Sequence, residues 1–372
     1  GPIPYSKMQN GTFSVPYDSQ RDVYMAMIDD LDAAMETLYT FASAGDGILM
    51  RDFDISSFKG DSRLWVSFAN TLKLRMAIRM SGVEPEARRI AEEAVRDMAT
   101  YGLIDANAEN LSFSSDSRQN PFYTQATSTS WQDLRSNASI VMYMNAYEDP
   151  RRASYFSKSG YDGIYVGVRA GIQNVTPTDY ATYSYPLFAE KDPVPVMYAS
   201  ESCFLRAEGA LLGWTMGDTA ENLYNTGVKT SLELWGNGSS YETYIASETA
   251  PALSYADPRN KHNVSDFGTA VSVKWADDGN ELVRIITQKW IANHMIGHEA
   301  WADVRRTGYP RLLQVVNNLS GGMWGNVDSS KGMRRLHYPQ SEYDNNRENV
   351  LKGVELLGGS DLHGTDVWWA KK

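Results

Sequence analysis

Residues 60–83 read GDSRLWVSFANTLKLRMAIRMSGV and predict a helix with defined ends. Asp61 or Ser62 suits the N-cap, because a short polar side chain can accept a hydrogen bond from the first free backbone amides. From Trp65 onward, apolar residues recur at the spacing of a helix face. Gly82 follows at a position where glycine commonly ends a helix. This stretch indicates that helices build the fold.

Similar patterns predict further helices along the chain. Each has apolar residues at helical spacing, and several begin at a polar cap or end at glycine or before proline. They cover about 19–44, 85–102, 140–147, 197–214, 219–235, 281–296 and 299–306. The turn at Gly217-Asp218 joins two of them into a hairpin, and such hairpins occur in tetratricopeptide-type arrays. We therefore expect a mainly α fold of irregular helical hairpins with long loops and a few short strands, one of them at 163–168.

One domain is expected over residues 1–372, with helices alternating with long polar loops. Loops of this length in a compact domain are usually functional. The predicted parts are a helical frame at about 19–102, 197–236 and 281–316, loop-rich insertions at about 103–196 and 237–280, and an irregular tail at 317–372.

Net charge and composition exclude several classes of partner. The chain carries a formal charge of −11, so a nucleic acid or an anionic lipid surface should be repelled. No apolar run approaches the ~18 residues of a membrane span. Cys203 is the single cysteine, so no internal disulfide can form. Because the chain opens at Gly1 without a start methionine, we expect a missing N-terminal segment that includes any targeting signal.

No catalytic motif stands out in the sequence. The chain lacks a G-x-S-x-G elbow, a Walker loop and a Rossmann glycine fingerprint. His294 and His298 are four apart on a predicted helix, beside Glu299, but the H-E-x-x-H pattern fails and a structural role is preferred. Cys203 lies in an apolar helix, which favours a buried, inert thiol. A pair of glycosidase carboxylates stays open, because sequence gives no distance between acids.

No cofactor is expected. Calcium stays an alternative, since acidic and Asn/Gly-rich loops supply oxygen ligands, although no twelve-residue EF-hand loop is present.

The helix at 60–83 is also rich in cations, with no acid beyond its cap: Arg63, Lys73, Arg75 and Arg79. We expect these side chains to pair with acids of the preceding helix, in preference to binding phosphate. The acids in question are Asp29, Asp30 and Asp32.

Several stretches together resemble the SusD/RagB family. The 60–83 helix is similar to a characteristic family helix, EDPRR at 148–152 to a family turn, and SCFLRAEGALLGW at 202–214 to the family F-x-x-A-E helix. QKWIANHMIGHEAWADVRRTGYPRL at 288–312 is close to a family signature. The opening GPIPYSKMQN, the segment RRLHYPQSEYDNNRENV and the ending SDLHGTDVWW also fit. These matches run through the chain in the expected order.

The resemblance implies a SusD-like fold and a function in nutrient capture. It implies a lipid-anchored protein on the outer membrane, at the cell surface, which binds oligosaccharide or polysaccharide without cleaving it. It also implies delivery of the glycan to a SusC-like TonB-dependent transporter. The lipid anchor would lie outside this chain.

Aromatic side chains supply the candidate ligand site. The chain has 22 Tyr and 10 Trp, and rings with polar tips suit wet binding surfaces, although a tyrosine-rich core is an equal alternative. Rings pack on sugar faces while polar groups take the hydroxyls. The candidates in loops are Phe122, Tyr123, Trp131, Tyr180, Tyr183, Trp275 and Trp324, with Arg118, Asn120 and Gln125 as polar partners. Packing is expected instead for Trp290, Trp301, Trp368 and Trp369.

Two alternatives remain from the sequence. The aromatic loops could capture a peptide or protein, as some family relatives are thought to do, or the chain could be a glycoside hydrolase. Retention of a glycan without turnover would separate capture from hydrolysis.

Overall fold

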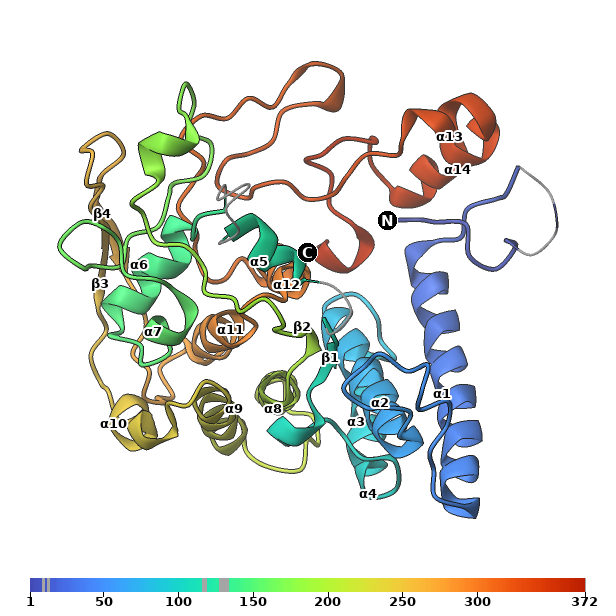
Figure 1. Cartoon of the computed structure of the whole chain (residues 1–372). Helices are drawn as coiled ribbons and strands as arrows, with labels where there is room; N and C mark the ends of the chain where they lie inside the picture. The colour runs from blue at the N-terminus through green and yellow to red at the C-terminus, as the bar shows by residue number, and fades with distance from the viewer. Residues whose placement is uncertain (9–10, 12–13, 116–118, 127–133, 372) are drawn as a thin grey trace.

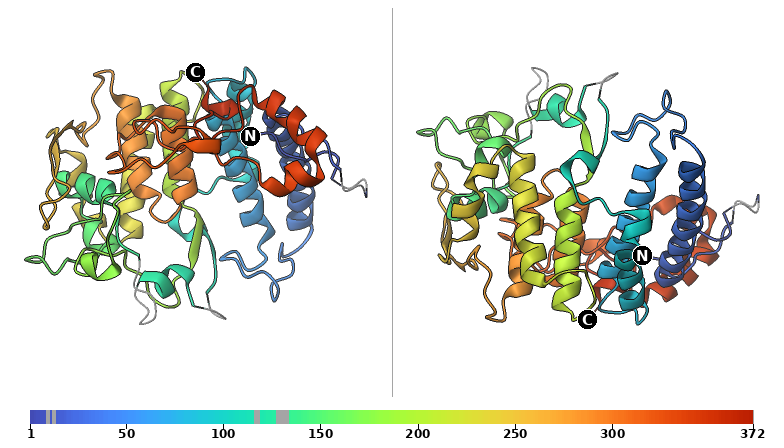
Figure 2. Two further views of the ribbon diagram at one scale, coloured as in Figure 1. Left: turned by 90° about the horizontal axis from the view of Figure 1, so that it is seen from above. Right: turned by 90° about the horizontal axis from the view of Figure 1, so that it is seen from below.

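The computed structural model describes residues 1–8, 11, 14–115, 119–126 and 134–371. A frame of helices organises it, as Figure 1 shows. The frame helices are α1 (Gln20–Ala44), α2 (Ser62–Arg79), α3 (Ala87–Arg96), α4 (Met98–Tyr101), α8 (Ala199–Leu211), α9 (Ala220–Leu234), α11 (Glu281–Ala292) and α12 (Gly297–Thr307). Figure 2, seen from below, places yellow α9 and yellow-green α8 beside cyan α2 and α3, with blue α1 outermost. The predicted mainly α fold is confirmed.

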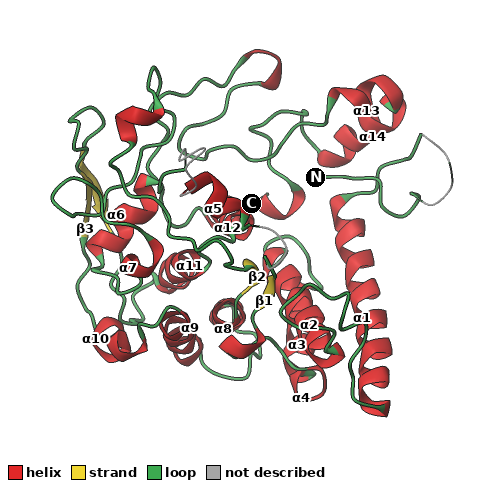
Figure 3. Cartoon of the chain, in the orientation of Figure 1, coloured by secondary structure: helices red, strands yellow, loops and turns green. Residues whose placement is uncertain are grey.

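Long loops and short elements surround this frame, and Figure 3 shows them in green between the red helices. The shorter helices are α5 (Pro121–Ala126), α6 (Ala138–Ala146), α7 (Arg152–Tyr155), α10 (Tyr241–Ile245), α13 (Gln340–Asn345) and α14 (Arg347–Leu357). Single 3₁₀ turns lie at Asn107–Glu109, Pro177–Tyr180, Gly238–Ser240, Gly322–Trp324 and Trp368–Ala370. The strands form two antiparallel pairs, β1 (Leu111–Phe113) with β2 (Val194–Met197) and β3 (Ala252–Tyr255) with β4 (Val264–Thr269).

Polar caps begin the main helices where the sequence predicts them. The Asp61 carboxylate accepts from the Arg63 backbone N–H at 2.9 Å, and the Ser19 hydroxyl accepts from Asp22 N–H at 3.0 Å. Each of these bonds satisfies a backbone donor that has no partner inside its helix. Local sequence chemistry therefore sets these helix starts.

The α8–α9 hairpin packs closely in the main core. Phe204 of α8 is fully buried and lies against Gly227 of α9, where an added Cβ would come within 3.0 Å of the ring. The two helices can approach this closely because Gly227 has no side chain. Burial of a phenylalanine side chain contributes about 1.5–3 kcal/mol. The hairpin thus gives α11 a rigid surface on which to pack.

Three local predictions differ from the structure. The predicted strand at 163–168 is absent, and Val168 makes an isolated bridge with Asn137. The tail predicted as irregular contains α13 and α14. The predicted helix over 281–296 ends at Ala292, because Met295 has a left-handed backbone with φ of 71°.

Buried ion pairs join α2 to α8, and α12 to α11 and α8. The Arg75 guanidinium on α2 donates to the Glu201 carboxylate on α8 at 2.8 and 2.6 Å. The Lys289 ammonium on α11 lies 2.8 Å from the Asp303 carboxylate on α12, and Arg306 of α12 pairs with Glu208 of α8. These charges are buried, so each needs its partner.

The expected pairing of the α2 cations is therefore correct in part. Lys73 pairs with Asp32 of α1 at 2.7 Å. Arg75 and Arg79 instead reach carboxylates on α8 and α12, because those side chains point into the frame.

Candidate functional site

An open groove of about 1300 Å³ runs along α12. The chain from Pro310 to Val315, which follows α12, extends the same wall. The start of α6 and Phe267 of β4 line another part, and the loop 329–332 lines a third. Figure 1 places α12 near the centre of the molecule, and Phe122 of α5 also lines the groove. The groove therefore lies where the helical frame meets three long loops.

One face of α12 supplies a stripe of side chains to this groove. His298, Trp301 and Arg305 follow each other at spacings of three and four residues, and all three line the groove. Residues at these spacings share one face of a helix. The Trp301 indole N–H donates to the Met333 carbonyl at 3.0 Å, and the Arg305 guanidinium lies 3.5 Å from the centre of the Trp301 ring. The two side chains hold each other in place.

The break between α11 and α12 forms the end of the groove. Left-handed Met295 separates the helices, and α12 begins without a side-chain cap on its N-terminus. His294 is buried and stacks on Tyr155 with 4.0 Å between ring centres. Burial lowers the pKa of His294 to about 3, so its imidazole is neutral at pH 7. The two histidines do not share a helix, and no zinc pair forms.

Asn293 lies at this break and also lines the groove. Its side chain is 2% exposed. Neither its amide nitrogen nor its amide oxygen has a hydrogen-bond partner among the described residues. A buried amide without a partner costs about 1–3 kcal/mol. Such a group indicates a place where a polar ligand or ordered water completes the site.

Further aromatic rings border the groove. Trp290 of α11 packs edge-on against Tyr143 at 5.6 Å, and Phe122 stacks on Phe188 at 5.5 Å. The Arg311 guanidinium lies over the face of the Phe267 ring, 5.0 Å from the ring centre. Apolar rings next to a few polar groups are typical of small-molecule sites.

Of the candidate residues from the sequence, Phe122 lies in the groove. Tyr123 and Gln125 share the short helix α5 with it, and Gln125 is exposed. Arg118 and Trp131 lie outside the described residues, so the structure gives no account of them.

Three candidates serve the fold, so their prediction as surface groups is wrong. The Asn120 side chain is buried; it caps α5 by accepting from Phe122 N–H at 2.8 Å and donates to the Asp192 carbonyl at 2.9 Å. Tyr180 and Tyr183 are buried in one cluster with their rings 4.8 Å apart. Long loops in this molecule cover a second core, and that core needs aromatic anchors.

Trp275 and Trp324 are half-buried, and each has partners outside the groove lining. The Trp275 indole packs on Tyr224 at 5.4 Å, and its N–H donates to Asp277 at 3.0 Å. Trp324 stacks on His337 with 3.4 Å between ring centres. Neither ring belongs to the α12 groove.

Trp290 packs against two core clusters, as predicted, and also lines the groove. Trp301 differs from the expectation, since it lines the groove although packing was predicted for it. The residues around Trp301 in the sequence do indicate a surface position. The spacing of His298, Trp301 and Arg305 puts an aromatic, a cation and an imidazole on one face of a helix, and that is not the composition of a core stripe. Trp369, by contrast, is buried as predicted.

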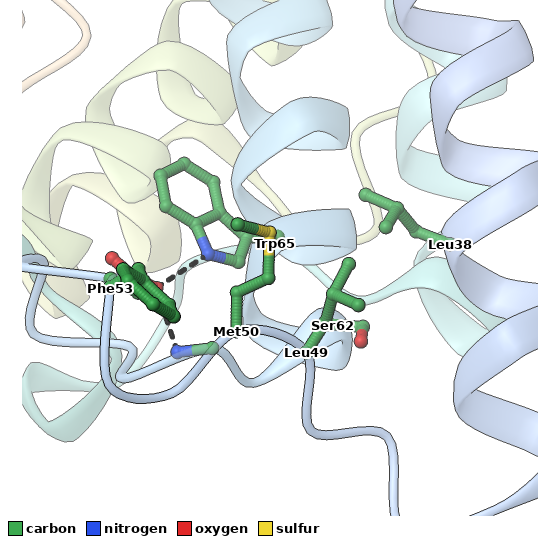
Figure 4. Close-up of a pocket in the computed structure, with 8 residues that line it drawn as sticks. Leu38, Leu49, Met50, Phe53, Ser62 and Trp65 are labelled. Atoms are coloured by element: carbon green, nitrogen blue, oxygen red, sulfur yellow. Dashed lines mark hydrogen bonds between the residues drawn. The ribbon is translucent and has the colours of Figure 1, made fainter.

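A second, smaller pocket lies between α1 and α2, and Figure 4 shows it. It has a volume of about 260 Å³ and lies beside Leu49, Met50 and Phe53. Phe53 is 79% exposed and Met50 is 64% exposed. Asp54 fixes this loop by accepting from the Trp65 indole N–H at 3.0 Å, as the dashed line in Figure 4 shows.

The titratable groups around the α12 groove restrict its chemistry. Among its described lining residues one carboxylate occurs, Asp366, and it is paired with Arg334. Within the described ranges no group of three His, Cys, Asp or Glu side chains is placed to hold a metal ion. The Cys203 thiol is buried in α8, and burial raises its pKa to about 11, as expected of an inert thiol.

None of the described helices is both long and apolar enough to cross a membrane.

The fold and the groove define an α-helical protein with an open groove bordered by aromatic rings. A family model described as "Susd and RagB outer membrane lipoprotein" matches residues 1–370. The chain therefore belongs to the SusD/RagB family, and the resemblance found in the sequence is confirmed. Comparison with curated proteins gave no match.

Solved structures agree with this family. A chitin-binding SusD homologue from Flavobacterium johnsoniae is 40% identical, with a TM-score of 0.93 over 100% of this chain and 77% of that chain. A SusD homologue from Bacteroides uniformis is 41% identical, with a TM-score of 0.91 and the same coverage. A SusD-like protein from Bacteroides thetaiotaomicron is 41% identical, with a TM-score of 0.89 and again the same coverage.

Proposed function

We propose that this protein binds an oligosaccharide or polysaccharide in the α12 groove at the cell surface and does not cleave it. The observation that carries the proposal is the groove itself. Its lining includes Trp301 and also Asn293, whose buried side-chain amide has no hydrogen-bond partner among the described residues. Sugars have apolar faces and many hydroxyls, so a ring beside free hydrogen-bonding groups matches both. The similarity to a chitin-binding SusD homologue supports the same class of ligand.

The charges of the groove support binding without hydrolysis. A glycosidase needs two carboxyl groups on opposite sides of the scissile bond. The described lining has Asp366, whose carboxylate is held by Arg334. A second acid with a raised pKa, which a general acid would need, is missing from the described lining. We propose on this ground that the protein is not an enzyme.

Delivery to a SusC-like TonB-dependent transporter is the second part of the proposal. Family membership supports a lipid-anchored position on the outer membrane. The exposed side chains of Met50 and Phe53 support a contact with another protein, because exposed apolar patches commonly mark such surfaces. Co-purification with the transporter should be lost in the double variant Met50→Ser/Phe53→Ser, while glycan binding stays. Unchanged co-purification would remove this surface from the proposal.

The test of the main proposal is a glycan array followed by affinity electrophoresis and product analysis on the intact chain. Retention of at least one glycan without new reducing ends is expected. Turnover would favour the hydrolase. A blank array together with hits in a peptide library would favour peptide capture and overturn the glycan proposal.

A further inference from the structure

The groove is cationic although the chain as a whole is acidic. The formal charge of the chain is −11. Among the described residues of the groove lining, four side chains carry a permanent positive charge and one carries a negative charge. The cations are Arg305, Arg311, Lys331 and Arg334, and the acid is Asp366. This local excess is opposite in sign to the rest of the molecule, so it needs its own explanation.

Three of these cations form no direct ion pair with a described carboxylate, although the charge of Lys331 contributes to lowering the pKa of nearby Asp328. Arg334 pairs with Asp366 at 2.5 Å. No described carboxylate lies within 4.0 Å of the charged groups of Arg305, Arg311 or Lys331, in contrast to the many ion pairs of the frame. Arg311 and Lys331 are exposed, which leaves their charges available to a ligand.

Arg305 is held ready in a fixed position. Its guanidinium lies over the Trp301 ring and 4.7 Å from the Trp369 ring, and it donates to the Arg334 carbonyl at 2.8 Å. Burial, together with the charges of Arg79 and Arg334, lowers the pKa of Arg305 to about 10. An anion beside such a partly buried cation would stabilise its charge. A preorganised guanidinium also binds carboxylate or sulfate well.

The beginning of α12 adds a second anion-attracting feature at the other end of the stripe. The helix is 11 residues long, and no side chain caps its first backbone N–H groups. Gly297 and His298 at this N-terminus line the groove, as does the unpartnered amide of Asn293. The uncapped first turn and the helix dipole favour a negative group here, in addition to Glu299, which lies in that turn and is paired with Arg79. The amide provides the independent sign that a ligand completes this end.

We propose that the groove is specific for anionic oligosaccharides, whose carboxylate or sulfate groups are bound by Arg305, Arg311 and Lys331 and by the N-terminus of α12, with Trp301 under a sugar ring. This inference rests on the proposed glycan capture and names its substrate class. A long polyanion such as nucleic acid does not fit, because the acidic remainder of the surface repels it. A short charged sugar meets the positive groove alone.

The test is calorimetry on the intact chain with three probes of matched length: an oligogalacturonate, a sulfated galactan oligosaccharide and a neutral chito-oligosaccharide. One or both acidic probes should bind more tightly than the neutral one, and their affinity should fall as ionic strength rises from about 0.02 M to about 0.2 M. The carboxylate and sulfate probes distinguish the two sources of charge.

The variant Arg311→Gln/Lys331→Gln should weaken binding of the acidic probe about tenfold or more. Both side chains are exposed, so its thermal unfolding should match that of the parent. Lys229→Gln on α9, also exposed, removes a charge outside the groove lining and should leave affinity unchanged.

Each outcome decides a different point. Binding of the neutral probe alone would overturn the anionic specificity and leave glycan capture standing. Equal losses in the groove variant and in Lys229→Gln would also overturn it, since the effect would then come from overall charge. Binding of no probe, with a blank glycan array, would overturn both proposals.

Discussion

On one face of α12, Glu299, Asp303 and Arg306 point into the interior, whereas on another face His298, Trp301 and Arg305 border the groove. The inner charges all have opposite partners on α2, α8 or α11. The outer arginine has aromatic rings and carbonyls around it. The difference teaches that charge on a helix is structural where it is neutralised and available for a ligand where it is not. The predictions below test that contrast.

The largest effect is expected from breaking the inner network. Glu201→Ala removes the carboxylate that Arg75 and Lys289 share and leaves buried positive charge without a partner. Unfolding free energy should fall by about 3–5 kcal/mol, as measured by denaturant titration. Glu233→Ala, at an exposed pair with Lys229, is the control and should change it by less than about 1 kcal/mol. Equal small losses would mean that the buried pairs of Glu201 do not stabilise the frame.

Low pH should lower the free energy of unfolding, because it protonates the buried carboxylates on the inner face of α12. Burial alone would raise the pKa of Asp303, but the charges of Lys289 and Arg306 outweigh it and hold the pKa well below its usual range. A folded-state pKa below the unfolded value gives stability that is complete above about pH 5 and is lost as pH falls through and below about pH 4. Unfolding free energy measured from pH 7 to pH 3 should show this decline.

The variant Asp303→Asn provides the control for that titration. It should be less stable at pH 7 and should lose less on acidification than the parent chain, because one titrating carboxylate is gone. If the unfolding free energies of the two proteins fell in parallel with pH, the loss of stability in acid would not come from Asp303.

The outer face is tested by a matched pair of tryptophans. Trp301→Ala should weaken glycan affinity about tenfold or more, whereas Trp275→Ala should leave it unchanged, because Trp275 packs on Tyr224 away from the groove. Affinity electrophoresis of both variants gives the comparison. A loss confined to Trp275→Ala would place the ligand on that loop and remove the α12 groove from the proposal.

The smallest effect is expected at the end of the shared helix. Gly308 ends α12 in the left-handed region with φ of 83°, where a residue with a Cβ atom is strained. Gly308→Ala should cost about 1 kcal/mol of unfolding free energy. Gly297→Ala, at the start of the same helix with open space around it, should cost less. Equal values would show that the helix end tolerates rearrangement.

Periodicity and caps were enough to predict most of the frame, because they depend on neighbours in sequence. Asp61 caps its helix as predicted, and Ser19 and Thr219 cap helices at the predicted starts of the ranges 19–44 and 219–235. Met295 shows the limit, since the apolar pattern continues through a residue whose backbone turns left-handed. The α13 and α14 helices were missed because their apolar faces are short and become clear only against Tyr17 and Tyr338.

The site was harder to predict than the fold. Loop aromatics were chosen for their polar neighbourhood, yet Tyr180 and Tyr183 anchor a second core. Packing was predicted for Trp301 because it belongs to a family motif whose residues look structural. Whether a ring faces a core or a groove depends on which distant segments meet it, and for Trp301 those segments are the loop 329–332 and the chain beyond Pro310.

The sequence by itself determined the helical class, the main helix boundaries and family membership, because these follow from local spacing and from motifs of adjacent residues. The tertiary structure alone decided which charges are neutralised and which are free. Arg75, Arg305 and Arg306 have identical chemistry, and their sequence surroundings do not separate them. The distance from each guanidinium to a carboxylate does, and that distance exists only once α2, α8, α11 and α12 have packed together.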